Sequence, residues 1–578
     1  MTETVERRRV TRSPESVRAG ALPQLRKLTF QWLLGGLAVG AGMLVLLLRI
    51  FEDVRGKPLF EDEAVAGLVA ARPLGEMLQT VWWERGGPPL HFLLSHLALA
   101  FDPSPFTLRW LAVVFALATI PVCWDLGRRL AGPAAGATGA LVAAASPMLA
   151  VYGSFGRMYS LYAFATALAT DLFVRALRER TPRAALAAAL AAWLLPAIHP
   201  YGAIAVGAEA LVGLWVWRGK PLRPALPVLG VGLALVPFLL ADVRLAQRFS
   251  VGLGGEASIA SPGDALGQVW RAVEASAGGR GWTLVVAVVL ATAGLAILAR
   301  EGDRAIVSYA ALVLLVPPAL LLVFRTSTEP GLSPRHLMFV LPLVAALIGA
   351  AVARAVRGRS AAVGLIAVAV VGVVVVSAPL GGIREPRDWA NDVLGGGPPR
   401  TALGGEDALA TPAAWLEDNV RPGTVLFPYS AVYLAALPAT RHAVALPYAQ
   451  TPTLLRSLER VDTPVRSLVV SVPIGATTLS APRLDTLLGP GLEARRFGGW
   501  ILVRGEGPFA EGHAVLLATY RALAAVRDST TSPRKDELSW YFTTTLSVLC
   551  GSLRTFGESC PPESLGWLQP TKRKRLGG

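Results

Sequence analysis

The chain has 578 residues, of which 53% are hydrophobic and only 16% are charged, and its mean hydropathy is +0.49. Soluble domains usually carry about 25% charged residues, so this composition excludes an ordinary water-soluble protein and indicates helices packed in a lipid bilayer. The net charge is +15. Because the basic residues fall between apolar runs, they are typical of cytoplasmic loops, and we expect no nucleic-acid partner.

The first apolar run, at about 29–50, follows an arginine-rich tail over residues 1–28. A signal peptide has a shorter apolar region that ends in a small-residue cleavage site, whereas this run leads directly into Arg49 and Ile50. The pattern therefore predicts an uncleaved membrane anchor with the N-terminus in the cytoplasm.

Ten further apolar runs follow, so the sequence predicts about eleven transmembrane helices within a membrane domain at 29–380. These runs lie at about 107–126, 131–152, 157–174, 184–200, 202–217, 222–241, 282–299, 304–324, 336–354 and 361–380.

Loop charge supports this topology. With the N-terminus inside, alternate loops should carry the Lys and Arg residues that favour the cytoplasmic side. The five predicted inside loops, at 127–132, 175–183, 217–223, 298–304 and 354–360, are all strongly basic. This agreement requires that the apolar segment 88–101, at about 14 residues, lies at the interface and does not cross. The sequence then places a first loop at 51–106, and everything after residue 380, outside the membrane.

The outer C-terminal part begins with a Gly- and Pro-rich linker at 381–410. Between 411 and 510, short apolar runs at 425–429, 443–448, 467–474 and 499–505 alternate with helical patterns at 411–420 and 452–460. Such alternation favours a small α/β domain. A C-terminal extension at 511–578 contains an amphipathic helix pattern at 512–526. The expected fold class is thus an α-helical polytopic membrane protein with an extracytoplasmic α/β domain.

Charged and polar residues gather at the predicted outer face. The first outer loop holds Glu61, Asp62 and Glu63, and the other outer turns hold Arg157, His199, Arg335 and His336. Each group alone has an ordinary explanation, such as acidic residues at a helix N-terminus, an arginine reaching to water, or a packing histidine. Together they favour a site for a phosphate-bearing lipid, because arginine binds phosphate and a carboxylate can act as a base.

The order of these segments resembles the GT-C membrane glycosyltransferases of the protein O-mannosyltransferase and aminoarabinose transferase type. The resemblance covers roughly residues 30–380. It rests on the acidic pair of the first loop, GGPPLHFLLSHLALAF, TLRWLAVVFALATIPVCWDLGRRLAG, AAASPMLAVYGSFGRMYSLYAFATAL, the HPYG turn and SPRHLMFVLPLV, in that order. It implies a GT-C fold and inverting transfer of a sugar from a polyprenyl-phosphate carrier to an acceptor hydroxyl outside the cytoplasm, in the cell membrane.

The resemblance also implies roles for individual residues. Asp62 matches the aspartate expected as catalytic base, and Glu63 is its neighbour in the catalytic pair. Arg157 and Arg335 match arginines that contact the carrier phosphate, and we place His199 with them. The remaining candidates for the substrate pocket are Tyr159, His91 and His336. Many relatives have an acidic residue two positions before the first arginine, where this chain has Phe155, so a metal or acceptor contact at that position is not carried over.

Several alternatives stay open on the sequence. A transporter or lipid flippase would also need many spans, although no pair of broken helices stands out. A noncatalytic scaffold that binds a partner through its external domain, and a transferase that builds cell-wall arabinan or mannan, are further alternatives. The acceptor can be a protein, a lipid or a polysaccharide. No cofactor is required by the sequence; Asp62 and Glu63 could hold a divalent cation, but no full ligand set is visible. Cys550 and Cys560 would lie outside, where a disulfide is permitted.

Overall fold

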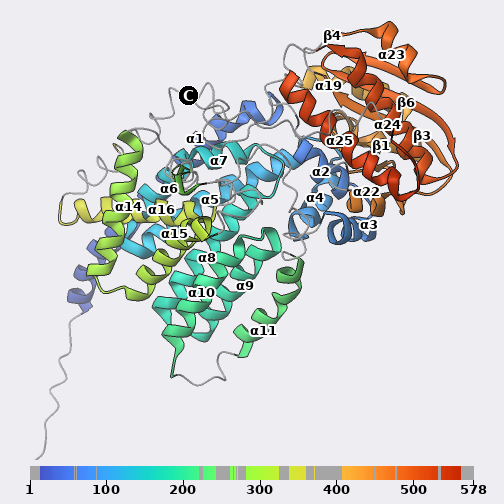
Figure 1. The fold of residues 1–578 in the computed structure, drawn as a ribbon. Helices are drawn as coiled ribbons and strands as arrows, with labels where there is room; N and C mark the ends of the chain where they lie inside the picture. Colours follow the sequence, from blue (N-terminus) through green and yellow to red (C-terminus); the bar gives the residue numbers. More distant parts are fainter. Residues whose placement is uncertain are drawn as a thin grey trace, which may run out of the picture.

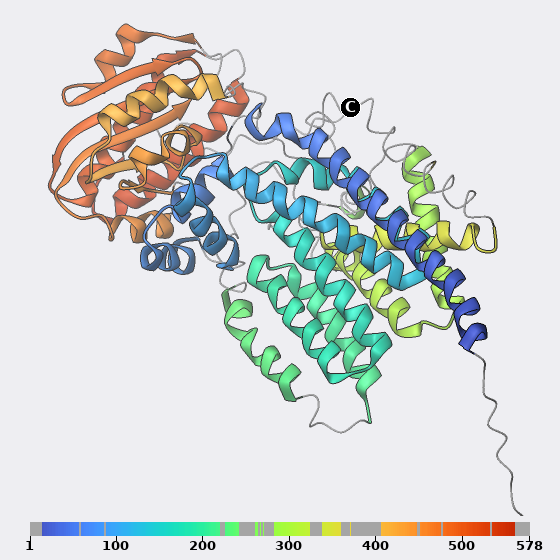
Figure 2. The same ribbon diagram turned by 180° about the vertical axis from the view of Figure 1, so that it is seen from behind.

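The computed structural model describes residues 14–56, 59, 61–85, 88–219, 226–241, a few positions between 261 and 270, 282–323, 338–359, 370, 406–447, 451–474, 478–531 and 535–560. A helical unit, coloured blue to yellow, lies beside a smaller α/β unit in orange and red, and helices of the first outer loop lie between them (Figure 1). The view from behind in Figure 2 shows the long helix α1 crossing the face of the helical unit.

The helices of the large unit follow the predicted apolar runs. They are α1 (Pro14–Gly56), α5 (Thr107–Ala131), α6 (Pro133–Ala145), α7 (Pro147–Gly153), α8 (Tyr159–Glu179), α9 (Pro182–Ile198), α10 (Gly202–Trp217), α11 (Leu226–Ala234), α14 (Trp282–Arg300), α15 (Arg304–Val323) and α16 (Leu341–Ala355). Within the described residues, four helices are long and apolar enough to cross a membrane, or five if the bent pair α6–α7 counts as one span. The predicted number of eleven spans is therefore not confirmed, because several helices are shorter than a span; the run at 361–380 lies outside the described residues apart from residue 370.

The bend between α6 and α7 measures 55° and has an identifiable cause. Pro147 has no backbone N–H and cannot continue the hydrogen-bond ladder of α6, so the last carbonyl groups of α6 lose their helical partners. Arg49 of α1 supplies a donor: its Nη1 lies 2.8 Å from the Ala145 oxygen and 3.5 Å from that of Ala144. The bend turns α7 toward the loop that precedes α8, which carries Arg157.

The first outer loop forms four short helices: α2 (Glu61–Ala70), α3 (Leu74–Gln79), the π-helix η1 (Thr80–Arg85) and α4 (Leu90–Phe101). The last of these corresponds to the apolar segment predicted at the interface. Its 12 residues extend about 18 Å at 1.5 Å per residue, which is too short to cross the hydrocarbon core of a bilayer.

The α/β unit contains a five-stranded mixed sheet in the order β2-β1-β3-β6-β5. Its strands are β1 (Thr424–Phe427), β2 (Val444–Ala445), β3 (Val465–Pro473), β5 (Leu492–Phe497) and β6 (Trp500–Phe509). The strands β2, β1 and β3 run parallel, while β6 is antiparallel to β3 and β5 is antiparallel to β6. Four of the five match the predicted apolar runs; β5 was not predicted because half of the residues in its sequence, LEARRF, are charged.

The side chains of the sheet alternate between two cores, as the two-residue period of a strand requires. On one face, Val425, Val470 and Val503 pack with α22 (Thr451–Leu458), α23 (Ala481–Leu488), α24 (Gly512–Ser529) and α25 (Lys535–Thr555). On the other face, Leu426 and Val469 share a core with α19 (Glu406–Asn419), α20 (Ala431–Ala435), α21 (Leu437–Thr440) and the helices of the first outer loop.

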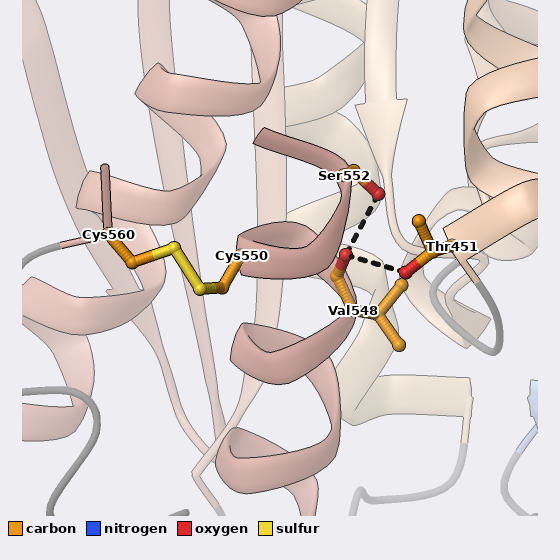
Figure 3. Close-up of a disulfide and its surroundings, with 5 residues drawn as sticks. All are labelled: Thr451, Val548, Cys550, Ser552 and Cys560. Carbon is orange, nitrogen blue, oxygen red and sulfur yellow. Dashed lines mark hydrogen bonds between the residues drawn. A yellow bond between two sulfur atoms is a disulfide. The ribbon is translucent and has the colours of Figure 1, made fainter. Parts of the chain in front are cut away.

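The core of this unit continues past residue 510, where the sequence analysis placed a domain boundary. Helix α24 matches the amphipathic pattern predicted there, and α25 was not predicted; both bury apolar side chains against the sheet, so they belong to the same packed unit. A disulfide joins Cys550, near the end of α25, to Cys560 (Figure 3). On the other side of α25, the Thr451 hydroxyl donates to the Val548 carbonyl over 3.2 Å.

Candidate active site

A buried ion pair joins the first outer loop to the helical unit. Arg109, in the first turn of α5, donates from Nε and Nη2 to the two carboxylate oxygens of Glu63, at 2.8 and 2.7 Å. Both side chains are only 1% exposed. The Nη1 group of Arg109 donates to the Val54 carbonyl at the end of α1, over 3.0 Å. The guanidinium and the carboxylate thus form a bidentate pair with two hydrogen bonds, and such pairs are among the strong charge-assisted contacts. Together with the bond to Val54, this pair holds α1, α2 and α5 against one another.

Glu63 also holds the loop between α7 and α8. Its Oε1 accepts a hydrogen bond from the backbone N–H of Gly156 at 2.8 Å. A Cβ at Gly156 would lie 3.1 Å from that oxygen and 3.0 Å from the Leu108 Cβ, so a glycine permits this close approach. The carboxylate thus accepts three hydrogen bonds inside the protein. Through these contacts Glu63 anchors the loop, and the expectation that it shares catalysis or a metal with Asp62 stays a prediction.

Asp62 and Arg157 lie next to each other, although they are 95 positions apart in the sequence. The Nη1 of Arg157 donates to the Asp62 backbone carbonyl over 3.2 Å. Asp62 is the second residue of α2 and is half-buried, so its carboxylate lies where the helix dipole favours negative charge. The Nε of Arg157 is buried and has no hydrogen-bond partner among the described residues. The guanidinium therefore has a donor available for a ligand.

His91, in the first turn of α4, lies close enough to Arg157 to sense its charge. The imidazole is 5% exposed, and its Nε2 has no hydrogen-bond partner in the part of the chain that the structure describes. Burial, with a further contribution from the positive charge of Arg157, lowers the pKa of His91 to about 3. The ring is therefore neutral at physiological pH and places a second polar atom beside Arg157.

This environment predicts a loss of stability in acid. The unfolded chain binds a proton at His91 below about pH 6.5, whereas the folded chain binds it only below about pH 3. Stability should therefore fall as the pH drops from about 6.5 toward 3, by about 2 kcal/mol between pH 7 and pH 5. Thermal unfolding of the purified protein in detergent at the two pH values measures this, with His91→Asn as the matched variant. Equal pH dependence in both proteins would contradict the assignment.

His199 and Tyr159 belong to a cluster of aromatic side chains beside the loop between α7 and α8. We call this group the aromatic cluster. The His199 ring stacks on Tyr162 and Tyr201 at centroid distances of 5.0 and 5.4 Å. Its Nδ1 accepts from the Tyr201 backbone N–H at 3.3 Å, so in the neutral ring Nε2 carries the proton and can donate. Tyr159 is 3% exposed and packs in the middle of the cluster. The members are Tyr152, Phe155, Tyr159, Tyr162, His199, Tyr201 and Phe339.

Arg335 and His336 lie outside the described residues, so their predicted place in the site is not tested. The nearest described residue after them is Met338, and the next one, Phe339, contacts Tyr162 in the aromatic cluster with 6.2 Å between ring centroids.

Sequence reasoning did not single out Arg109 or Arg49. Both are arginines inside apolar runs, which was the available signal, because a charged side chain in hydrocarbon is costly unless it is paired. For the metal that the sequence left open, no group of three or more His, Cys, Asp or Glu side chains with suitable spacing lies among the described residues.

A membrane unit of packed helices, with its polar site in the first outer loop and an α/β unit at its C-terminus, is the architecture implied by the GT-C resemblance. No family model matches the sequence, and no curated protein does. Among solved structures, the chain is similar to ArnT from Cupriavidus metallidurans bound to undecaprenyl phosphate. The TM-score is 0.54 at 15% identity, and the match covers 82% of this chain and 98% of that one.

The apo state of the same ArnT gives a TM-score of 0.54 at 16% identity, with the same coverage. The oligosaccharyltransferase of Archaeoglobus fulgidus in its apo form matches with a TM-score of 0.44 at 12% identity, over 76% of this chain and 69% of that one. At such identities the likeness to ArnT establishes the fold. The chain has the fold of this ArnT, and the predicted resemblance is confirmed for the fold.

Proposed function

We propose that this protein is an inverting glycosyltransferase that moves a sugar from a polyprenyl-phosphate carrier to an acceptor hydroxyl on the extracytoplasmic side of the membrane. The observation that carries the proposal is the contact between Arg157 and the helix turn that bears Asp62, in a chain with the fold of ArnT. The structure of ArnT with undecaprenyl phosphate supports a carrier of this chemical class.

In the proposed reaction, the Asp62 carboxylate takes the proton of the acceptor hydroxyl as its oxygen attacks the anomeric carbon of the sugar. The bond between that carbon and the phosphate oxygen breaks on the opposite side, and the electron pair leaves with the carrier phosphate. One displacement inverts the anomeric configuration. Arg157, Arg335 and the Nε2–H of His199 stabilise the charge on the departing phosphate, which needs no acid to protonate it. The buried aromatic cluster holds the His199 ring in its orientation.

Both ends of α5 support the proposed orientation, in which the first outer loop lies on the extracytoplasmic side of the membrane. Arg109 lies in its first turn and Arg128 near its last, a separation of about 28 Å at 1.5 Å per residue, which is close to the thickness of the hydrocarbon core. The far end is rich in arginine, where Arg128 and Arg129 both pair with Asp125, as the positive-inside rule expects of a cytoplasmic end. The Cys550–Cys560 disulfide suits an oxidising compartment for the α/β unit.

A direct test uses the purified chain in proteoliposomes with a polyprenyl-phosphate carrier that bears a radiolabelled sugar. A transferase moves label from the lipid to an acceptor, whereas a transporter moves labelled lipid or sugar across the bilayer and leaves the sugar–phosphate bond intact. Mass spectrometry of glycans from cells with and without the gene identifies the sugar and the acceptor, and it separates protein, lipid and arabinan or mannan acceptors. Label that crosses the membrane without transfer would refute the proposal.

The role of Arg157 predicts a loss of carrier affinity when its guanidinium is removed. A hydrogen bond to a charged group contributes about 1.5–3 kcal/mol, so Arg157→Ala should weaken binding of undecaprenyl phosphate by about 10- to 100-fold. Isothermal titration in detergent micelles measures this. The matched control is Arg175→Ala in the same helical region, because Arg175 pairs with Glu179 on the exposed surface and should bind the carrier as the unmodified chain does. Equal affinity in both variants would remove Arg157 from the site.

A further inference from the structure

The helix that carries Asp62 is enclosed between the two units of the protein. Apart from its acidic N-terminal turn, α2 is apolar on every side, and all of its residues from Ala64 to Ala70 are buried. A helix that is hydrophobic all round needs apolar partners on all sides. On the membrane side these include Leu108 of α5, and on the other side they come from α20 of the α/β unit. Figures 1 and 2 both show α2 at this junction.

Gly67 lies where α2 is closely approached by side chains of both α20 and α5. A Cβ at Gly67 would lie 2.4 Å from the Cδ1 of Leu434 in α20 and 3.1 Å from the Cδ1 of Leu108 in α5. Leu434 is fully buried, so it has little room to move aside in a close-packed core. The missing side chain at position 67 therefore lets the α/β unit reach the backbone of α2 directly, five positions after Asp62.

Arg72 connects the C-terminal end of α2 to the α/β unit. Its side chain, 8% exposed, follows α2 by two residues. Nη1 donates to the Thr80 hydroxyl over 2.9 Å, and Nη2 donates to the backbone carbonyl of Ala445 over 3.0 Å. Ala445 belongs to β2, which is an edge strand of the sheet. One guanidinium thus joins the first outer loop to the α/β unit, 373 positions further along the chain.

We infer that the C-terminal α/β unit acts as a positioning element for catalysis, in which Gly67, Leu434 and Arg72 hold α2 so that Asp62 stays beside the phosphate site. The inference rests on the proposed function. Asp62 lies on α2 itself, whereas Arg157 and His199 come from the loops before α8 and α10. Because Glu63 of α2 also holds the loop that bears Arg157, loosening α2 should lower kcat strongly and weaken carrier binding to a smaller extent. The unit is then part of the catalytic machinery and not an independent partner-binding scaffold.

The first test uses Arg72→Met in the full-length chain, because methionine keeps an apolar stem and removes both hydrogen bonds. We expect kcat for sugar transfer to fall by about 10- to 100-fold, the effect of a small displacement of a reacting group, with a much smaller change in the dissociation constant for undecaprenyl phosphate. Arg72→Lys should recover part of kcat, since the ammonium group can still donate. The control is Arg495→Met at β5, the opposite edge strand, where Arg495 pairs on the surface with Glu493.

A second test uses the contact at Gly67. Gly67→Ala should lower kcat because its methyl group collides with Leu434, and adding Leu434→Ala should restore kcat by making room. This rescue ties the loss of kcat to the contact between α2 and α20, because changes at residues that do not touch would otherwise add. A kcat of Arg72→Met equal to that of the unmodified chain, or a double variant at positions 67 and 434 that is worse than either single one, would overturn the inference. Absence of transfer by the unmodified chain would instead refute the proposed function.

Discussion

Replacing Asp62 with asparagine should reduce sugar transfer by about 10² to 10⁴ in kcat, the usual contribution of a positioned general base. Asparagine has nearly the same shape and leaves the Asp62 backbone carbonyl in place for Arg157, so the fold and the carrier site should persist. Initial rates of transfer from the radiolabelled carrier, together with the dissociation constant for undecaprenyl phosphate, measure the two properties separately.

The matched control for this substitution is Glu76→Gln. Glu76 lies on α3 of the same outer loop and is exposed to solvent. The substitution therefore removes one negative charge from the loop without changing the proposed site. Transfer by that variant should equal transfer by the unmodified chain. If Asp62→Asn turned over at a near-normal rate, Asp62 would not be the base, and the reaction would need another proton acceptor.

The second large effect concerns the buried pair of Glu63 and Arg109. Both side chains are 1% exposed, and removing one partner leaves the other charge buried without compensation, which costs about 3–5 kcal/mol. Glu63→Gln and Arg109→Met should each lower the thermal unfolding temperature strongly. Glu63→Gln should also impair transfer, because a neutral amide oxygen is a weaker acceptor for the Gly156 N–H than the carboxylate, so that the loop bearing Arg157 is held less firmly.

The double variant Glu63→Gln with Arg109→Met distinguishes a coupled pair from two separate defects. Since it buries no unpaired charge, it should be less destabilised than the sum of the single variants. Thermal unfolding in detergent, followed by the monodisperse fraction in size-exclusion chromatography, provides the comparison. Arg175→Met is the control for an exposed pair, with side chains 45% and 40% exposed, and should cost at most about 1 kcal/mol. Strictly additive effects in the double variant would show that the two charges do not stabilise each other.

The local elements of this protein could be predicted from its sequence because they depend on the spacing of apolar residues along short stretches. Within the described residues, the apolar runs correspond to helices of the membrane unit, and the short apolar segment at 88–101 corresponds to the helix α4. The short apolar runs predicted between 411 and 510 correspond to the strands β1, β2, β3 and β6. The strand β5, which carries charged residues, and the helix α25 lacked a clear pattern. The order of the polar segments was also enough to indicate the GT-C fold.

The roles of neighbouring residues were decided only by tertiary structure. Asp62 and Glu63 are adjacent acids at one helix N-terminus, and nothing local distinguishes them; Glu63 becomes an anchor because Arg109, 46 positions away, lies opposite it. The contact of Arg72 with Ala445 spans 373 positions, and the core shared by the first outer loop and the α/β unit is equally non-local. Hydrophobic periodicity fixes which face of an element is buried, but it does not specify which distant element covers that face.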